Sequence, residues 1–323
     1  MKAIVYTSYG FPDVLHLKEV EKPVPKDNEV LVKVHAASVN SWDWDLLTGK
    51  PYVYRLLFGL LKPKYNILGC DVAGTVEAIG KNVTQFKIGD QVFGDISMHW
   101  GGYAEYVCAG EKNITLKSAG MTFEQAAAIP QAAVLALQSL RDKRQIKAGD
   151  KVLINGAGGG VGTFAIQMAK AFGAEVTAVD SSEKLDMLSK IGADHVMDYT
   201  KEDFTKNGKQ YDLIVDVVAS RSIFTYKRSL LPNGIFVMVG GKISSLLQAG
   251  FLGSLISLFG DKKLGILMHE PNKDMTFIKE LFESGKVVPV IDKYYSLEDV
   301  PEALQYLGDG RVKGKLIIKI VND

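Results

Sequence analysis

The sequence predicts an α/β protein of two domains, a rolled β domain and a doubly wound parallel sheet. The chain has 323 residues, which is long for a single hydrophobic core. Residues 1–121 carry short, irregularly spaced strand patterns, whereas strands and helices alternate from residue 151 onward. The C-terminal GKLIIKIVND alternates like the first strands. We therefore expect a discontinuous β domain, 1–121 and 291–323, and a sheet domain, 122–290.

The first part of the chain contains short alternating runs that turn segments separate. GFPD and KPVPKDNE have the glycine, proline and acidic residues that are typical of turns. Strands at this irregular spacing favour a rolled β domain over a βαβ repeat. The strands expected here are 2–7, 15–20, 30–37, 71–79 and 103–107, with a further short strand within 87–94.

The second part alternates strands with helices, which predicts a parallel, doubly wound sheet. TFEQAAAIPQAAVLALQSLRD is rich in alanine and leucine and has Thr122 as a candidate cap. The helix from Val161 repeats apolar residues every three or four positions and ends at Gly173. Further helices are expected at 181–194 and 274–284. The expected strands are 151–155, 175–179, 195–197, 213–216, 235–239 and 287–290.

The strongest chemical signal is the segment KVLINGAGGGVGTFAIQMAKAFG. An apolar strand runs into glycines and then directly into a helix, so free backbone N–H groups and a helix N-terminus meet at one point. This geometry suits a pyrophosphate and predicts a dinucleotide site, although glycines also form plain strand-to-helix turns. In register the loop is Ala157-Gly158-Gly159-Gly160-Val161-Gly162, with alanine at the first glycine position. Gly159 would admit the phosphates, and Gly162 would let the helix pack on the sheet.

Two further segments follow expected strands of this sheet. Asp180 stands where the fingerprint places an acid for the ribose hydroxyls, which favours NAD(H) because a carboxylate repels a 2′-phosphate. Ser181 and Lys184 follow and could hold such a phosphate, so the coenzyme stays open; Asp180 could also be a helix cap. VMVGG, 237–241, would approach the nicotinamide half or form a simple turn.

Composition and charge argue against several classes of function. The net charge is +1 with acids and bases mixed, and no nucleic-acid-binding signature is present, so we expect no nucleic-acid partner. Cys70 and Cys108 are the only cysteines, too few for a disulfide framework or a multi-cysteine zinc cage. MKAIVYTSYG is a strand pattern and not a signal peptide. We expect a cytoplasmic protein.

The segment Ile243–Phe259, ISSLLQAGFLGSLISLF, has 17 residues without a charge. It is shorter than a bilayer-spanning helix and carries serines, glycines and a glutamine. We interpret it as a buried helix or as the interface of a homodimer, with peripheral membrane contact as the alternative.

Motifs along nearly the whole chain resemble those of medium-chain dehydrogenases/reductases, in the zinc-independent quinone oxidoreductase group. The similar segments are ASVNSWDW, LGCDVAGTVEAIG, FKIGDQVFG, GGYAEYV, AAAIPQAAVLALQSL, the glycine loop, LSKIGADHVMDY and GKLIIKI. The resemblance implies a GroES-like β domain, a Rossmann domain, a cofactor in the cleft between them, and usually a dimer or tetramer.

The resemblance also bears on metal. Zinc-dependent members of the superfamily hold a catalytic metal with a cysteine near the Asn40 position and a histidine–glutamate pair, whereas this chain has Asn40, Cys70 and Asp71. These residues make a poor tetrahedral cage, so we expect no zinc. Without a metal to polarise an alkoxide, the accessible reaction is hydride delivery from NAD(P)H to a quinone or an α,β-unsaturated carbonyl. Cys70 is not expected to be a nucleophile, because Asp71 would raise its pKa.

The resemblance implies roles for individual residues. Asn40 would face the nicotinamide ribose or the substrate, and Asp43 is its companion in an N-x-x-D pattern or else a structural carboxylate. Tyr52 and Tyr54 lie on the cleft-lining loop and could donate to the substrate oxygen or only form its walls. Lys315 matches a lysine that reaches the cofactor in relatives, or is a surface lysine. The candidate cofactor-binding residues are Asn40, Gly158, Gly159, Gly160, Val161, Asp180, Ser181, Lys184, Tyr199, Val217, Val239, Gly240, Gly241 and Lys315.

The leading hypothesis is an NAD(P)H-dependent reductase of quinones or enones. NADPH is favoured on the precedent of the group, and NADH is possible given Asp180. The second hypothesis is a dinucleotide-binding protein with little turnover, crystallin-like or regulatory. A zinc alcohol dehydrogenase is the third.

Overall fold

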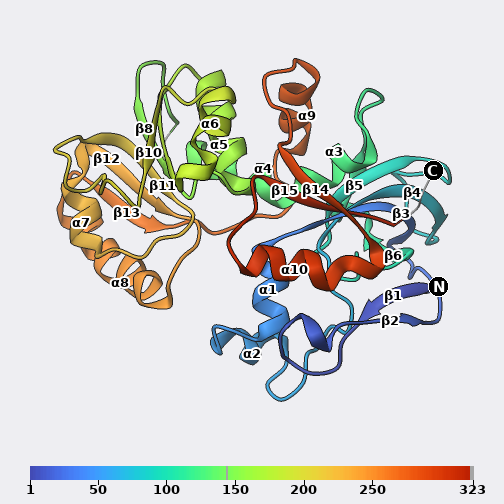
Figure 1. Ribbon diagram of the computed structural model, residues 1–323. Helices are drawn as coiled ribbons and strands as arrows, with labels where there is room; N and C mark the ends of the chain where they lie inside the picture. Colours follow the sequence, from blue (N-terminus) through green and yellow to red (C-terminus); the bar gives the residue numbers. More distant parts are fainter. Residues whose placement is uncertain (143–144, 321–323) are drawn as a thin grey trace. The chain divides into compact units, whose positions relative to one another are not determined.

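The computed structural model describes residues 1–142 and 145–320 (Figure 1). The chain forms two compact units. The β unit comprises Met1–Gln131, Pro271–Lys279 and the chain from Ile291 onward. The parallel-sheet unit comprises Ala132–Glu270 and Glu280–Val290. The predicted fold class is therefore confirmed.

The β unit is built on a mostly antiparallel sheet in the order β14-β15-β3-β4-β5-β7, in which β6 also pairs with β3. Only β14 and β15 run parallel, and β1 pairs with β2 in a separate two-stranded sheet. The strands are β1 (Lys2–Val5), β2 (His16–Glu19), β3 (Glu29–Val39), β4 (Asp71–Ile79), β5 (Gln91–Asp95), β6 (Tyr106–Gly110), β7 (Thr115–Leu116), β14 (Ile291–Ser296) and β15 (Lys315–Lys319).

Strand β3 is the centre of this sheet. Its sequence EVLVKVHAASV is rich in valine, which suits a buried pleated surface. β4 pairs along one edge, while β6 and β15 share the other edge at opposite ends of the strand. Register shifts in the β3–β4 ladder, at Leu31/Val32 and Val34/Ala36, bend the strand so that its C-terminal end turns into the unit.

The helices of the β unit are α1 (Ser41–Thr48), α2 (Val53–Phe58), α3 (Phe123–Ala128) and α10 (Val300–Gly308). The Thr122 hydroxyl caps α3 by accepting the Gln125 N–H at 3.2 Å, as the sequence predicts. α3 packs on β3, β4 and β15, so the unit extends to Gln131 and does not end at the predicted residue 121. α4 (Pro130–Arg141) and α9 (Met275–Glu283) each span a boundary between the units.

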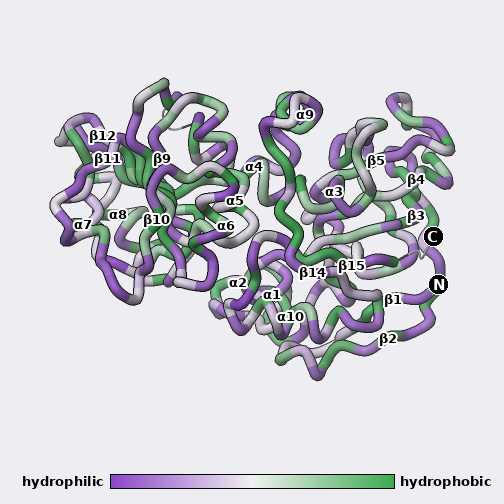
Figure 2. Tube along the Cα trace, turned by 45° about the horizontal axis from the view of Figure 1, so that its top comes forward, coloured by the Kyte–Doolittle hydropathy of each residue, from purple (hydrophilic) through white to green (hydrophobic). Residues whose placement is uncertain are grey.

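The second unit has a six-stranded parallel sheet in the order β10-β9-β8-β11-β12-β13. Helices α5 and α6 lie on one face, and α7 and α8 lie on the other, as right-handed crossovers require (Figure 1). Hydrophobic residues dominate its central strands (Figure 2). The elements are β8 (Lys151–Asn155), α5 (Gly160–Ala171), β9 (Glu175–Asp180), α6 (Leu185–Lys190), β10 (His195–Asp198), β11 (Tyr211–Asp216), α7 (Ile223–Arg228), β12 (Leu230–Met238), α8 (Ile243–Phe259) and β13 (Lys263–Ile266). Four short 3-10 turns complete the described elements: Pro12–Val14, Glu111–Asn113, Ser182–Lys184 and Leu297–Asp299.

The predicted strand at 287–290 is wrong. The backbone of Val288 pairs with the side-chain amide of Gln167, whose Nε2 donates to Val288 O at 3.0 Å and whose Oε1 accepts Val288 N–H at 2.9 Å. A side chain therefore takes the hydrogen bonds that a neighbouring strand would make. The sixth strand of the sheet is β13, four residues that follow α8 and include Gly265.

The uncharged segment Ile243–Phe259 forms helix α8, but the expectation of a buried helix is wrong. Its buried residues are the small ones, Ser245, Ala249 and Gly253. A Cβ on Gly253 would lie 2.7 Å from Leu264 O, so the helix lies close against β13. Of its large apolar residues, Leu246, Leu252 and Ile256 pack against the core of the unit, whereas the others are exposed: Ile243, Leu247, Phe251, Leu255, Leu258 and Phe259. Among the described helices, none is long and apolar enough to cross a membrane.

Candidate functional site

The glycine loop lies at the carboxyl edge of the parallel sheet, between β8 and α5. Gly156 has φ +77°, a conformation that favours glycine, and it turns the chain out of β8. A Cβ on Gly162 would lie 2.5 Å from Ala157, so only glycine lets α5 pack this closely on the loop. Gly160 and Val161 begin the helix, as the fingerprint predicts.

The loop leaves space at one glycine. A Cβ on Gly159 would meet only Gly156 O, at 3.7 Å. Gly159 is also the N-cap of α5 and has no side chain to cap it, so the first N–H groups of the helix face this space. An open side above a helix N-terminus suits a diphosphate, and the residues present therefore fit a dinucleotide.

Asp180, at the end of β9, is tied to the glycine loop. Its Oδ2 accepts Gly158 N–H at 2.7 Å, and its Oδ1 accepts Ser181 N–H at 2.8 Å. The Lys184 ammonium lies 3.4 Å from Oδ1. Tyr199 N–H donates to the Asp180 carbonyl at 3.2 Å, which brings the residue after β10 to the same edge.

A buried carboxylate that sequence reasoning missed organises the neighbouring loops. Asp216, at the end of β11, accepts Asn155 Nδ2 at 2.9 Å, the Tyr226 hydroxyl at 2.8 Å and Val218 N–H at 3.0 Å. Burial raises the pKa of Asp216, and these hydrogen bonds oppose that rise. An aspartate at the end of an apolar strand was the available signal, since a buried carboxylate needs several donors.

The predicted residues after β11 and β12 gather at this edge. Val217 N–H donates to Asn155 O at 3.0 Å, and Val239 N–H donates to Asp216 O at 2.9 Å. Gly240 O accepts Ala219 N–H at 3.0 Å, and Gly241 forms a bridge with Ala219. The structure thus places the predicted cofactor-binding residues of this unit along one edge of one sheet.

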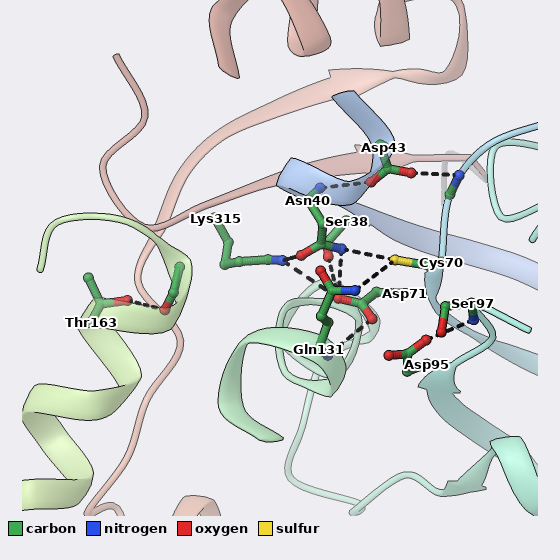
Figure 3. A network of polar contacts seen from close by, with 12 residues as sticks. Ser38, Asn40, Asp43, Cys70, Asp71, Asp95, Ser97, Gln131, Thr163 and Lys315 are labelled. Carbon is green, nitrogen blue, oxygen red and sulfur yellow. Dashed lines mark hydrogen bonds and ion pairs between the residues drawn. The ribbon is translucent and has the colours of Figure 1, made fainter. Parts of the chain in front are cut away.

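A second group of polar residues is buried in the β unit (Figure 3). The β3–β4 register sets Ser38 opposite Asp71, and β15 brings Lys315 beside the end of β3. Figure 3 shows the side chains of Asn40, Asp71 and Lys315 pointing toward one another. Lys315 is 2 % exposed, which rules out the alternative of a surface lysine.

Asn40 is held in one orientation by its partners. Its Oδ1 accepts the Lys315 ammonium at 2.5 Å. Its Nδ2 donates to Asp71 Oδ2 at 3.0 Å and to Cys70 Sγ at 3.4 Å. Because the ammonium can only donate and the carboxylate here accepts, the amide cannot flip without losing these bonds.

Asp71 is the anion of this cluster. It accepts the Ser38 hydroxyl at 3.1 Å and Gln131 N–H at 3.1 Å, and it lies 3.6 Å from the Lys315 ammonium. Burial raises the pKa of Asp71, and Lys315 and the donors to the carboxylate oppose this rise. Asp71 and Gln131 were not among the predicted site residues, since only folding brings α4 to β4.

The contacts of Asp43 are those of a structural carboxylate, the second of the two roles expected for it. Its Oδ2 accepts Asn40 N–H at 2.8 Å and its Oδ1 accepts Gly69 N–H at 2.9 Å, so it fixes the start of α1 against the residue before Cys70. Burial raises the pKa of Asp43 to about 7. Tyr52 lies exposed at the start of α2, and Tyr54 is half-buried, with its pKa raised by burial.

Cys70 is a buried thiol. Its Sγ accepts hydrogen bonds from Asn40 Nδ2 at 3.4 Å and from Gln131 Nε2 at 3.6 Å. Burial raises its pKa well above the ordinary value, and Asp71, Asp43 and Asp95 raise it further. A thiol that stays protonated is a weak nucleophile and a weak metal ligand.

Cys70, Asp71 and Asp95 are the residues of this cluster that could hold a metal ion. Ligand atoms of Cys70, Asp71 and Asp95 lie within 4.8 Å of one another, close enough for one ion. However, the Lys315 ammonium already lies against Asp71 and Asn40, and a second cation there would face it in a buried environment. A protonated thiol and an ammonium together do not fit a zinc site of the usual tetrahedral kind.

Comparisons with known proteins agree with both units. Residues 26–139 match the alcohol dehydrogenase GroES-like domain family, 191–318 the zinc-binding dehydrogenase family, and 143–221 the alanine dehydrogenase/PNT C-terminal domain family. The chain is 35 % identical to a 2-methylene-furan-3-one reductase of Solanum lycopersicum, over 98 % of this chain and 79 % of the relative. It is 32 % identical to an NADPH-dependent alkenal/one oxidoreductase of Arabidopsis thaliana, over 98 % and 79 %. The quinone oxidoreductase structure from Coxiella burnetii has a TM-score of 0.90 and 32 % identity, over 99 % of both chains.

A dinucleotide cradle on a parallel sheet and a GroES-like β unit define a nicotinamide-dependent oxidoreductase. With relatives above 30 % identity along almost its whole length, the chain belongs to the medium-chain dehydrogenase/reductase superfamily, in its quinone oxidoreductase group. The stretch that matches the zinc-binding dehydrogenase family contains no cysteine, since both cysteines precede residue 109.

The buried Asp43 carboxyl predicts a specific dependence of stability on pH. Its pKa is about 7 in the folded protein and 3.8 in its ordinary state, so the folded protein keeps a proton that the unfolded chain loses. Its contribution is therefore fully present below about pH 4 and is lost as pH rises through 7. In Asp43→Asn the free energy of unfolding should fall less steeply between pH 5 and 7, by up to about 1.4 kcal/mol per pH unit for one proton. Urea unfolding at several pH values measures this slope, and parallel curves for the two proteins would contradict the assignment.

Proposed function

We propose that this chain transfers hydride from NADPH to a quinone or an α,β-unsaturated carbonyl compound, without a metal. The observation that carries the proposal is the open space at Gly159, a glycine N-cap in a loop that packs tightly at Gly158 and Gly162. The relatives named as a furanone reductase, an alkenal/one oxidoreductase and a quinone oxidoreductase support the class of acceptor.

When bound, the reduced nicotinamide supplies the hydride. The residues of the chain bind and orient it. The Gly158–Gly160 backbone and the N-terminus of α5 hold the pyrophosphate, and the loops after β9, β11 and β12 hold the two ends of the dinucleotide. In the β unit, the cluster of Lys315, Asn40 and Asp71 presents a fixed amide and a buried cation.

The reduced acceptor needs a proton on its oxygen, and we assign its donation to Tyr52 or Tyr54. Both phenols belong to the segment that opens α2. A phenol is protonated at neutral pH and can donate, and burial raises the pKa of Tyr54 further above its ordinary value. Asp43 positions Asn40 through the backbone and does not itself move a proton in this scheme.

The proposal that the reaction needs no zinc rests on the Lys315 ammonium. It supplies positive charge beside Asp71, Asp95 and Cys70, where a zinc enzyme would place its ion, and it reduces the affinity of the cluster for a second cation. Without a Lewis acid, the acceptor must be electrophilic already, which fits a quinone or an enone better than an alcohol.

The preference for NADPH rests on the surroundings of Asp180. Its two oxygens already accept backbone N–H groups, and the Lys184 ammonium offsets its charge. A carboxylate paired with an ammonium repels a 2′-phosphate less, and Lys184 and Ser181 carry donor groups at the same point. The name of the Arabidopsis relative, which includes NADPH, supports this choice.

Steady-state turnover tests the proposal. Purified protein should oxidise NADPH with 1,2-naphthoquinone, 9,10-phenanthrenequinone or an alkenal, and should not oxidise alcohols with NADP⁺. NADH should give at least about tenfold lower kcat/KM, and Lys184→Ala should remove most of that difference because it removes the donor to the 2′-phosphate. Tight coenzyme binding without turnover of any acceptor would support the binding-protein hypothesis and contradict an enzyme.

A matched pair of glycine variants tests whether the glycine loop binds NADPH. Gly159→Val should fold, since its Cβ has room, yet it fills the space for the phosphates and should weaken NADPH binding at least about tenfold. Gly265→Val in β13, where a Cβ also meets nothing within 4 Å, should leave binding unchanged. Equal affinities for the two variants would remove the glycine loop from the site.

We also infer that the chain is a homodimer through α8. The outward face of this helix carries Leu247, Phe251, Leu255 and Leu258, which we call the α8 face, and the helix has no charged residue to oppose self-contact. Leu255→Lys should therefore convert a dimer to a monomer in light scattering. A monomeric wild-type protein would contradict the inference.

A further inference from the structure

A second exposed apolar surface lies in the β unit, outside the residues assigned above. Leu56 and Leu57 in α2, and Leu60 and Leu61 just after it, are 71, 68, 63 and 87 % exposed. We call these four residues the leucine patch. Single exposed leucines are ordinary on a protein surface, but four exposed leucines within six positions are an unusual concentration of apolar area that calls for a partner.

The leucine patch is presented on a backbone that is held on its other side. The Tyr9 hydroxyl donates to Gly59 O at 2.5 Å and to Phe58 O at 3.1 Å, and Lys64 N–H donates to Phe58 O at 2.7 Å. The Phe58 ring packs against Trp42 and Tyr65, whose ring centroids lie 6.1 and 6.4 Å away. The segment therefore has a fixed inner side, made by Phe58 and the backbone, and the leucines form its outer side.

The charges around the leucine patch have one sign. Lys50, Arg55, Lys62 and Lys64 lie within this stretch, and no acidic residue occurs between Asp45 and Asp71. Arg55 is engaged with the carbonyls of Gly49 and Thr48, whereas Lys50, Lys62 and Lys64 are exposed. Because the net charge of the chain is only +1, these cations are a local feature and not an overall bias.

The positive charge beside the leucine patch indicates which kind of partner would cover it. A symmetric contact between two copies would place the same surface on both sides and bring the lysines of both chains together without a carboxylate. An anionic lipid surface instead offers hydrocarbon for the leucines and negative headgroups for the lysines, whose flexible stems let the ammonium stay at headgroup level. Lysines also flank α8, but Lys262 and Lys263 donate to backbone carbonyls and Asp261 stands beside them in the sequence, so this helix lacks flanking charges of a single sign.

We propose that the leucine patch and its flanking lysines bind the surface of an anionic membrane. Leu60 and Leu61 enter the acyl boundary, and Lys62 and Lys64 contact the phosphate groups. The binding is peripheral, since the contact is made by one short helix and the turn that follows it. The binding needs no coenzyme.

Vesicle sedimentation tests this binding. The full chain is mixed with vesicles of phosphatidylcholine alone, or of phosphatidylcholine with one quarter phosphatidylglycerol, at low and high salt. The wild type should bind the anionic vesicles, bind the neutral ones weakly, and lose binding at high salt. Leu60→Ser with Leu61→Ser should reduce the partition coefficient at least about tenfold on anionic vesicles, because two apolar side chains no longer enter the lipid.

Two further variants make the result specific. Lys62→Gln with Lys64→Gln should weaken binding to anionic vesicles and leave the weak binding to neutral ones unchanged. In the monomeric Leu255→Lys background, Leu247→Ser with Phe251→Ser removes a similar apolar area from the α8 face and should leave vesicle binding unchanged. Thermal unfolding checks that each variant is folded, which is expected because every changed side chain is exposed.

Three outcomes would overturn the proposal. The wild type could fail to bind anionic vesicles at low salt. Binding could survive loss of Leu60 and Leu61, or depend on the α8 face instead. Finally, the leucine variant could change the mass in light scattering without changing vesicle binding, which would make the patch a contact between copies of the chain.

Discussion

The buried contact of Lys315 with Asp71 and Asn40 is the interaction on which the β unit depends. An ammonium that is 2 % exposed is tolerated only with an anion and hydrogen-bond acceptors, and this one has both, at 3.6 and 2.5 Å. Lys315 and Asn40 are 275 positions apart, so satisfying this charge fixes the C-terminal strand against the N-terminal half of the chain. The discontinuity of the unit follows, because β15 must take its place beside β3 for the cluster to form.

In the parallel-sheet unit, too, buried carboxylates need hydrogen-bond donors, and this need positions the loops around them. Asp216 accepts hydrogen bonds from Asn155, Tyr226 and the backbone of Val218. Asp180 accepts hydrogen bonds from the backbone of the glycine loop and of Ser181, and it pairs with Lys184. Each carboxylate ends a strand at the carboxyl edge, where no further strand residue supplies donors. The loops fold over these anions, and the open space at Gly159 is left among them. In both units, therefore, buried charge decides where the polar groups at the ends of the strands are placed.

The sequence predicts the features that local pattern controls and fails where distant segments decide. The strands 71–79 and 151–155, the glycine loop and the Thr122 cap are confirmed, because alternation, glycine geometry and capping act over a few residues. Segment 287–290 alternates no differently from a strand, but the Gln167 side chain takes its hydrogen bonds. The apolar composition of 243–259 predicts a buried helix or a homodimer interface. In α8 the small residues are buried and several of the large ones are exposed, which excludes the fully buried helix. Lys315 was assigned from resemblance alone, and its contact with Asp71 follows from strand register that no local pattern encodes.

We propose that the Lys315 ammonium takes the place of a metal ion among Cys70, Asp71 and Asp95, and cobalt binding tests this most directly. Co²⁺ bound by a cysteine thiolate gives an intense near-ultraviolet charge-transfer band. The account predicts that the wild-type protein contains far less than one zinc per chain and shows no such band when titrated with Co²⁺. It predicts that Lys315→Ala gains the band, and that Cys70→Ser in the same variant abolishes it. A wild-type protein that binds one Co²⁺ per chain with the thiolate band would contradict the account, whatever the variants do.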